Sequence, residues 1–149
     1  MIQRQIKNFD LAQICDSGQC FRMSMTEDGL YRVCADNRCL TVSQSGNQFE
    51  FYCSLEDFQD FWEKYFDLEK DYRSYIEKIN PRDAYLVNAA QFGSGIRILR
   101  QDLWEMLVSF LISQQNHIGR IRRCIENLCR TYGEKKIDSI GRDYYTFPK

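Results

Sequence analysis

The sequence predicts an α+β fold, with a small antiparallel β-sheet in the first half of the chain and helices in the second half. Two observations support this prediction. Between Phe21 and Cys53, short runs of alternating apolar and polar residues are separated by turn residues, which is typical of an antiparallel meander. From Ser54 onward, apolar residues recur at helical spacing. The chain has 149 residues and is 44% hydrophobic, which suits one globular domain or slightly more.

Four short strands are expected between residues 21 and 53. Their turns are expected at three dipeptides, Asp28-Gly29, Asp36-Asn37 and Gly46-Asn47. In the last of these strands, Phe49, Phe51 and Cys53 alternate with Glu50 and Tyr52. Because successive side chains of a strand point to opposite faces, we expect the first three to face the core.

The next segment predicts three helices before a glycine-containing break. The first begins at Ser54, whose hydroxyl is placed to cap the helix, and its inward residues are expected to be Leu55, Phe58, Phe61, Trp62 and Tyr65. A second helix is expected over residues 69–79. A third is expected over residues 81–92, with Asn80 as its cap and Pro81 at its first position. The break Gly93-Ser94-Gly95 divides the chain into predicted domains 1–94 and 95–149.

Two further helices are predicted beyond the break. Apolar residues surround the helix over residues 103–112 almost completely, so we expect it to be central and buried. The last clear helix is expected to start near Asn116. Its inward stripe is predicted to consist of Ile118, Ile121, Ile125 and Leu128.

Charge is divided unequally along the chain, although the net charge is only −1. Residues 1–94 carry 10 Lys/Arg and 15 Asp/Glu, whereas residues 95–136 carry 8 Lys/Arg and 4 Asp/Glu. A polyanion responds to local charge within a Debye length of about 10 Å, so the basic segment is a candidate nucleic-acid surface. The alternative is an ordinary solvated helix face.

The seven cysteines predict neither a metal site nor a disulfide framework. Three pairs share a five-residue step, which differs from the spacing of zinc ligands, and the chain has one histidine. We expect reduced, mostly buried thiols and no metal. No apolar run is long enough to cross a membrane and the first residues lack the pattern of a signal peptide, so a soluble, cytoplasmic protein is expected.

Five hydrogen-bonding residues lie at the joint between the last two predicted helices, and we call this segment the polar corner. It consists of Ser113, Gln114, Gln115, Asn116 and His117. Two interpretations fit: a polar turn, or a set of side chains directed at a partner.

Four segments together resemble the 8-oxoguanine DNA glycosylase family, in the order that this family uses. They are FDLAQICDSGQCFR at 9–22, YFDLEKDY at 65–72, RILRQDLWEMLVSFLISQQNHIGRI at 97–121 and LCRTYG at 128–133. The resemblance implies a sheet domain followed by the opening helices of a helix-hairpin-helix glycosylase domain. It also implies removal of oxidised guanine in base-excision repair by an N-glycosylase with associated AP lyase activity, without a cofactor.

The resemblance assigns recognition roles to five residues. The backbone carbonyl of Gly18 would accept a hydrogen bond from the N7–H of 8-oxoguanine, whereas guanine has an acceptor at N7. Gln115, Asn116 and His117 match the family motif that fills the space left by the flipped base, with Gln and His replacing two of its usual asparagines. Arg120 would recognise the estranged cytosine through paired donors. For Gly18 the alternative is a turn glycine, and His117 could instead be a first-turn residue that binds phosphate or water.

The family's catalytic lysine and aspartate have no counterpart in these residues. We therefore expect an N-terminal fragment that is inactive alone, with Lys135, Lys136 and Lys149 solvated. The expected partner is double-stranded DNA containing 8-oxoguanine, in the nucleoid or nucleus, with no membrane and no obligate protein partner. Self-association is expected to be possible through Trp104, Leu107 and Phe110. The alternatives are a noncatalytic damaged-DNA-binding or interaction module and a glycosylase for alkylated bases.

Overall fold

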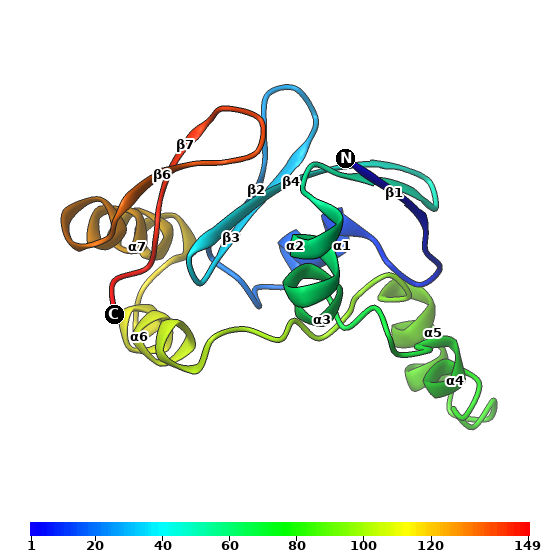
Figure 1. The fold of residues 1–149 in the computed structure, drawn as a ribbon. Helices are drawn as coiled ribbons and strands as arrows, with labels where there is room; N and C mark the ends of the chain where they lie inside the picture. The colour runs from blue at the N-terminus through cyan, green and yellow to red at the C-terminus, as the bar shows by residue number, and fades with distance from the viewer.

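The computed structural model describes residues 1–149, which form a five-stranded sheet, a two-stranded sheet and a series of helices (Figure 1). The strands are β1 Ile2–Gln5, β2 Met23–Met25, β3 Tyr31–Ala35, β4 Arg38–Ser45, β5 Gln48–Phe51, β6 Lys135–Ile137 and β7 Asp143–Tyr145. The helices are α1 Leu11–Asp16, α2 Leu55–Asp57, the π-helical segment Phe58–Trp62, α3 Glu63–Tyr65, α4 Arg73–Ile76, α5 Ala84–Phe92, α6 Leu103–Ser113 and α7 Ile118–Tyr132. The predicted α+β class is confirmed.

The large sheet has the order β1-β5-β4-β3-β2, and every neighbouring pair is antiparallel. The meander predicted over residues 21–53 corresponds to β2 through β5. Phe49, Phe51 and Cys53 are buried, as the alternation predicts. In Figure 1, α6, α7 and the β6–β7 pair lie at the β2 end of this sheet, whereas β1 is the strand at its other edge.

Four elements were not predicted because each carries little periodic signal. Strand β1 is four residues long and has only one apolar residue, and it forms by pairing with β5. Helix α1 has six residues and is capped by Asp10, whose carboxylate accepts from the Gln13 N–H at 2.8 Å. The pair of β6 and β7 has three residues in each strand. Tertiary pairing, which local sequence does not report, determines the three strands.

A core of 18 buried residues lies between the large sheet and the helices that cover it. Its largest members include Trp62, Phe49, Phe51, Phe58 and Phe66, whose rings contact one another at centroid distances such as 4.9 Å for Phe51 and Phe58. A second, separate cluster contains four buried residues, Ile121, Ile125, Cys129 and Phe147. The two clusters differ greatly in the apolar area that they remove from water.

The predicted helices after Ser54 are shorter or start later than expected. Ser54 caps its helix as predicted, but a π-helical segment interrupts the helix and Leu55 is 50% exposed. Only Arg73–Ile76 of the predicted 69–79 helix is α-helical. The cap of α5 is Asp83, not Asn80, because the Asn80 side chain instead accepts from the Arg82 N–H in a local turn.

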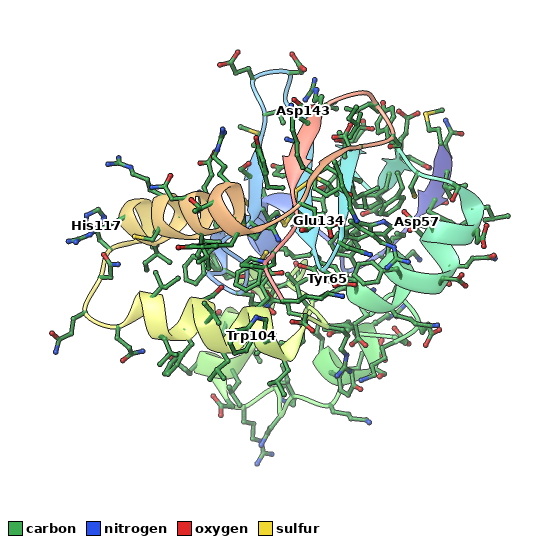
Figure 2. The ribbon with its side chains drawn as sticks, turned by 60° about the vertical axis from the view of Figure 1, so that its left-hand side comes forward. Asp57, Tyr65, Trp104, His117, Glu134 and Asp143 are labelled. Carbon is green, nitrogen blue, oxygen red and sulfur yellow. A yellow bond between two sulfur atoms is a disulfide. The ribbon has the colours of Figure 1, made fainter.

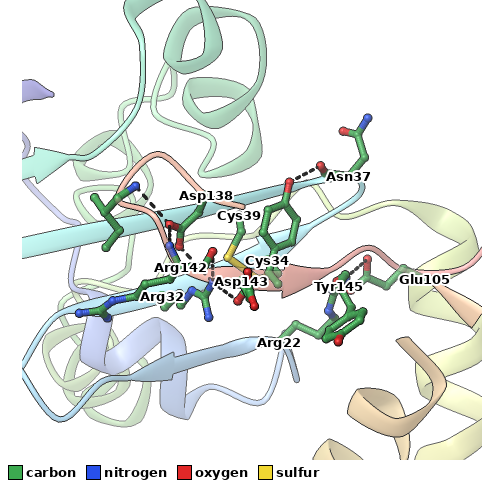
Figure 3. Close-up of a disulfide and its surroundings, with 12 residues drawn as sticks. Arg22, Arg32, Cys34, Asn37, Cys39, Glu105, Asp138, Arg142, Asp143 and Tyr145 are labelled. Atoms are coloured by element: carbon green, nitrogen blue, oxygen red, sulfur yellow. Dashed lines mark hydrogen bonds and ion pairs between the residues drawn. A yellow bond between two sulfur atoms is a disulfide. The ribbon is translucent and has the colours of Figure 1, made fainter. Parts of the chain in front are cut away.

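The prediction that all cysteines are reduced is wrong for one pair. Cys34 and Cys39 are directly opposite each other in the β3–β4 hairpin and are joined by a disulfide (Figure 3). Their five-residue spacing contains the two-residue turn Asp36-Asn37, which brings the two Cα atoms within 4.1 Å. The other five cysteines are free thiols, and all but Cys124 are buried.

The prediction that the helix over residues 103–112 is buried is also wrong. In α6, only Glu105 and Ser109 are buried, while Trp104, Leu107 and Phe110 are 52%, 49% and 60% exposed. The reason is that the rest of the chain packs against only one side of α6, the side that carries Glu105 and Ser109. In α7, Ile121 and Ile125 face inward as predicted, but Ile118 is exposed because it lies at the first turn, beyond the edge of the second cluster.

The segment before α6 is attached to the sheet domain by a buried arginine. Arg97 is 3% exposed and donates to four backbone carbonyls, those of Lys7, Asn8, Asp67 and Lys70. Burial lowers the pKa of its guanidinium from the usual value. Leu99 packs into the first core, so this connection is fixed to the sheet. None of the helices is both long and apolar enough to cross a membrane.

Candidate functional site

The polar corner connects the end of α6 to the start of α7, and most of its side chains hydrogen-bond to backbone groups of these two helices. Ser113 Oγ and Gln114 Nε2 both donate to the Phe110 carbonyl, at 2.7 and 3.2 Å. Asn116 Nδ2 donates to the Ile112 carbonyl at 3.0 Å. These bonds satisfy carbonyl groups at the C-terminal end of α6 that have no partner inside the helix. This part of the corner therefore forms a polar turn, which is the first of the two interpretations.

Gln115 differs from its neighbours because its side chain is exposed and makes no hydrogen bond within the chain. Its φ of 48° lies in the left-handed region, which non-glycine residues adopt rarely. Such a conformation at a loop tip is often associated with function. The corner thus holds its backbone by internal bonds and directs one amide side chain to solvent.

His117 is the N-cap of α7, which corrects its predicted place as a residue of the first helical turn. The Nδ1 atom accepts from the Arg120 N–H at 3.3 Å, so the imidazole replaces the Ser or Asp that more commonly caps a helix. Figure 2 shows His117 at the outer end of the joint between the two helices.

Arg120, Arg122 and Arg123 lie in the first two turns of α7, and none of them forms an ion pair in the chain. The first turn contains no acidic residue. Arg130, further along, is neutralised by Glu126 at 2.8 Å. The end of α7 next to the polar corner is therefore the positively charged end, although positive charge opposes the dipole there. This arrangement favours binding of an external anion.

Gly18 ends α1, where its φ of 78° matches the left-handed residue that commonly follows a helix C-cap. A Cβ at this position would meet no atom within 4 Å. Its carbonyl accepts no backbone hydrogen bond. Gly18 also lines a cavity of about 240 Å³ with Gln101, Phe110 and Ser113.

Gln19 holds the Gly18 loop against the segment before α6, a role that local sequence patterns did not predict. Its side chain donates to the Arg97 carbonyl at 2.9 Å and accepts from the Leu99 N–H at 3.1 Å. Gln101 Nε2 in turn donates to the Gln19 carbonyl at 2.7 Å. Only the Ser-Gly-Gln part of the family resemblance could have indicated this residue.

A buried ion pair connects the residue that precedes β2 to α6 near the same cavity. Arg22 Nη1 lies 3.4 Å from Glu105 Oε2, and Arg22 also donates to the Tyr145 carbonyl (Figure 3). Burial raises the pKa of the Glu105 carboxyl, and the neighbouring Arg22 opposes that rise. The pair was not predicted because its two residues are 83 positions apart in the sequence.

The lysines of the chain are exposed or ion-paired and do not form a nucleophilic site. Lys135 Nζ lies 2.6 Å from Asp143, whose hydrogen bond raises the pKa of the amine. Lys136 pairs with Glu134 and Lys149 is exposed near Asp36. An amine nucleophile requires the opposite shift, toward a lower pKa. No group of three His, Cys, Asp or Glu side chains is placed to hold a metal ion.

Residues 1–107 match the family model described as the 8-oxoguanine DNA glycosylase N-terminal domain. The chain belongs to this family. A protein of Saccharomyces cerevisiae named N-glycosylase/DNA lyase is 35% identical over 86 residues, which are 57% of this chain and 22% of that protein. The resemblance inferred from the four sequence segments is thereby confirmed.

Solved structures of family members share the fold over 98% of this chain. The Clostridium acetobutylicum 8-oxoguanine glycosylase/lyase in its apo form is 40% identical with a TM-score of 0.91, and 51% of that chain is covered. The same protein, in complex with double-stranded DNA containing cytosine opposite 8-oxoguanine, gives a TM-score of 0.90. The protein MBOgg1, in complex with a low-affinity DNA ligand, is 46% identical with a TM-score of 0.90, and 50% of it is covered. The chain thus spans about half the length of these solved relatives.

A more distant structure shares the fold alone. The 3-methyladenine DNA glycosylase of Archaeoglobus fulgidus is 15% identical with a TM-score of 0.62, covering 100% of this chain and 56% of that protein.

The structure brings four of the five predicted recognition residues together. Gln115, Asn116, His117 and Arg120 lie at the α6–α7 joint, within one turn of the start of α7. Gly18 is not among them, because the cavity that it lines extends to Ser113 but to none of those four.

Proposed function

We propose that this chain forms the DNA-recognition part of an 8-oxoguanine N-glycosylase with AP lyase activity, acting in base-excision repair. The observation that carries the proposal is the exposed pair of Gln115 and Arg120 beside a corner whose other side chains are satisfied internally. Family membership and the DNA complex of the Clostridium acetobutylicum relative support the same assignment. The proposed partner is double-stranded DNA, so the expected location is the nucleoid or the nucleus.

In this proposal the polar corner enters the duplex where a base has been extruded. A glycosylase must remove its target base from the stack, because the glycosidic carbon is inaccessible in an intact duplex. Gln115 then occupies the space left by that base, while Asn116 and His117 hold the corner in position through their bonds to Ile112 and Arg120. The internal bonds leave Gln115 as the side chain free to contact DNA.

Arg120 is proposed to recognise the base that has lost its partner. An unpaired cytosine presents O2 and N3 as acceptors, and a guanidinium offers parallel donors that match them. Arg120 is exposed and has no carboxylate partner, so its donors are available. Thymine and adenine place N–H groups where the arginine also donates, and this conflict would produce a preference for cytosine.

Gly18 is proposed to accept the N7–H of 8-oxoguanine through its backbone carbonyl. The carbonyl accepts no backbone hydrogen bond in the chain, so it is free to accept one from a ligand. Guanine has no N7–H and would therefore lack this hydrogen bond. The alternative role, a glycine that only ends α1, predicts no such discrimination.

The division of the chain into a sheet domain, 1–94, and a helical domain, 95–149, belongs to this proposal. It is supported by the second cluster of four buried residues, all of which lie beyond residue 94. Leu99, which packs into the first core, joins the two parts.

Binding to short duplexes containing 8-oxoguanine or guanine opposite cytosine tests the proposal. We expect weak affinity, with a Kd of about 10⁻⁴ to 10⁻⁶ M, that falls steeply between about 50 and 200 mM salt because phosphate contacts dominate. Fluorescence anisotropy over that salt range measures it. Absence of DNA binding, or binding that salt leaves unchanged, would contradict the proposal.

Borohydride trapping separates recognition from catalysis. We expect this 149-residue chain to form no covalent adduct with lesion or abasic duplex, because the lysines described above are exposed or ion-paired and do not form a nucleophilic site. A trapped adduct would show that this chain itself carries the nucleophile.

A further inference from the structure

A path of three hydrogen bonds runs through the polar corner and ends at Arg120. Asn116 Nδ2 donates to the Ile112 carbonyl at the end of α6, at 3.0 Å. Asn116 Oδ1 accepts from the His117 N–H at 3.0 Å, and His117 Nδ1 accepts from the Arg120 N–H at 3.3 Å. His117 is therefore the last link between the C-terminal end of α6 and the arginine proposed to recognise the opposite base.

The acceptor at this last link is a ring nitrogen, which sets the tautomer of His117. A neutral imidazole has one N–H and one acceptor nitrogen, and the hydrogen bond made by one nitrogen decides the state of the other. Because Nδ1 accepts, the hydrogen is on Nε2. The Arg120 N–H also donates to the His117 carbonyl at 2.9 Å, so the ring and the carbonyl share one donor. The side-chain cap exists only while the ring is neutral.

Protonation of the ring would replace this attraction by repulsion. In the imidazolium both ring nitrogens are donors, so an Nδ1–H would face the Arg120 N–H. The positive charge would also lie at the N-terminal end of the α7 dipole, where cations are unfavourable. The ring must then rotate out of the cap, which leaves the first turn of α7 and the backbone of Arg120 less firmly held.

The charged groups around the joint do not stabilise an imidazolium at His117. The first turn of α7 contains no acidic residue. The only charged residue of α6 is Glu105, which is buried against Arg22, and the only one of α1 is Asp16. His117 is exposed and forms no ion pair with any carboxylate. Its protonation is therefore set by the pH of the solution.

We propose that His117 is a positioning residue for Arg120 and that it acts only as the neutral imidazole. This role rests on the proposed function, in which Arg120 recognises the base opposite the lesion. On acidification the chain should lose its preference for cytosine, because paired donors must be held in one orientation to match two acceptors. Its general affinity for duplex DNA should rise at the same time, because the imidazolium adds a positive charge. Unfolding would instead lower both quantities.

Binding of the 149-residue chain to duplexes with a stable abasic site opposite cytosine or adenine tests this role. Fluorescence anisotropy at constant ionic strength is measured at about pH 7.5 and about pH 5.5, the range in which an imidazole gains its proton. The ratio of the two affinities should fall about fivefold on acidification, as expected for the loss of an N-cap. The affinity for the adenine duplex should rise.

Two variants of His117 separate the cap from the charge. His117→Asn is the conservative variant, since an asparagine carbonyl caps a helix and does not titrate in this range. It should retain part of the preference at about pH 7.5 and keep the same value at about pH 5.5. His117→Ala has no cap and should show a reduced preference at both. Protonation of Glu105, whose pKa burial raises, affects wild type and His117→Asn alike, so their difference reports the imidazole.

Asp83→Ala is the matched control for loss of a helix cap. It removes an N-cap of the same kind, a bond of 3.0 Å to the Leu86 N–H at the start of α5, which lies far from α7 (Figure 1). The preference for cytosine and its pH dependence should remain those of the wild type. A loss of preference in Asp83→Ala equal to that in His117→Ala would show general destabilisation and overturn the proposed role.

The tautomer is observable without DNA and without a variant. His117 is the only histidine of the chain, so long-range proton–nitrogen spectra report it alone. They should show a bare Nδ1 and a protonated Nε2 at about pH 7.5, and the Arg120 amide should shift with the same midpoint as the ring. A neutral ring with its hydrogen on Nδ1 would overturn the inference.

The binding outcomes distinguish failure of this role from failure of the proposed function. A cytosine preference that is equal at both pH values, or that falls equally in His117→Asn, would overturn the positioning role alone. A wild-type chain with no preference for cytosine at about pH 7.5 would overturn the proposed function, and the positioning role with it.

Discussion

The sheet region and the helical region of this chain differ in how they are held together. Eighteen buried residues form one continuous core under the five-stranded sheet, whereas four buried residues join α7 to the C-terminal segment. The helical region is attached mainly by polar contacts, such as the pair of Arg22 and Glu105. Stability is therefore concentrated in the first region, and the second region presents its arginines and apolar side chains to the outside.

The two regions should respond differently to the loss of a buried aromatic ring. Phe51→Ala should lower the free energy of unfolding by about 3–5 kcal/mol, because Phe51 is fully buried among other rings. Phe147→Ala should instead release α7 locally and leave the sheet folded. Thermal unfolding and hydrogen exchange measure the two effects. Equal loss of protection throughout the chain in both variants would show that the regions are not separable.

The buried ion pair predicts a pH-dependent effect of similar or smaller size. Arg22→Met leaves the Glu105 carboxylate buried without its cation, which should cost about 3–5 kcal/mol of stability at pH 7. Burial raises the folded-state pKa of Glu105, so folding favours its protonated form. That contribution is fully present below the ordinary pKa of glutamate and is lost as the pH rises through the raised value.

The cost of Arg22→Met should therefore shrink on acidification, which chemical denaturation between pH 4 and pH 7 would measure. The double variant Arg22→Met/Glu105→Gln is the control and should recover most of the loss at pH 7. A cost that does not vary with pH would contradict the assigned role of the carboxylate.

The exposed face of α6 predicts self-association, which remains a prediction here. Leu107 and Phe110 are 49% and 60% exposed on a helix whose buried face is polar. An apolar surface of this kind favours association between copies. Sedimentation should show a mass above 17.8 kDa that rises with concentration. The double variant Leu107→Lys/Phe110→Lys should return it to the monomer value, and a wild-type chain that stays monomeric at all concentrations would refute the prediction.

The sequence predicted the features that depend on local periodicity. The alternation of Phe49, Phe51 and Cys53 and the helical spacing of Ile121 and Ile125 both correspond to buried faces. The polar corner lies at the α6–α7 joint as predicted, because a run of polar residues between two apolar-faced helices favours a turn there.

The remaining features depend on contacts between distant residues. The pairing of β1 with β5, the Cys34–Cys39 disulfide and the pair of Arg22 with Glu105 each require the register of the folded chain. The buried position predicted for α6 was wrong because periodicity reports how apolar a helix is but not which neighbours cover it.

The smallest expected effect concerns the central claim, that Arg120 recognises the base opposite the lesion. Duplexes with a stable abasic site opposite cytosine, thymine, adenine or guanine present that base already unpaired, so binding does not require base extrusion. The chain should prefer cytosine by about 1–3 kcal/mol, the discrimination expected of a bidentate contact. Arg123→Ala, the matched control, should weaken binding equally for all four and reduce the salt dependence.

The decisive measurement is the affinity of Arg120→Ala for these four duplexes, by fluorescence anisotropy at low salt. We expect the preference for cytosine to disappear while the affinities for the other three duplexes change little. Equal weakening for all four bases, as expected for Arg123→Ala, would make Arg120 a backbone contact and contradict the account.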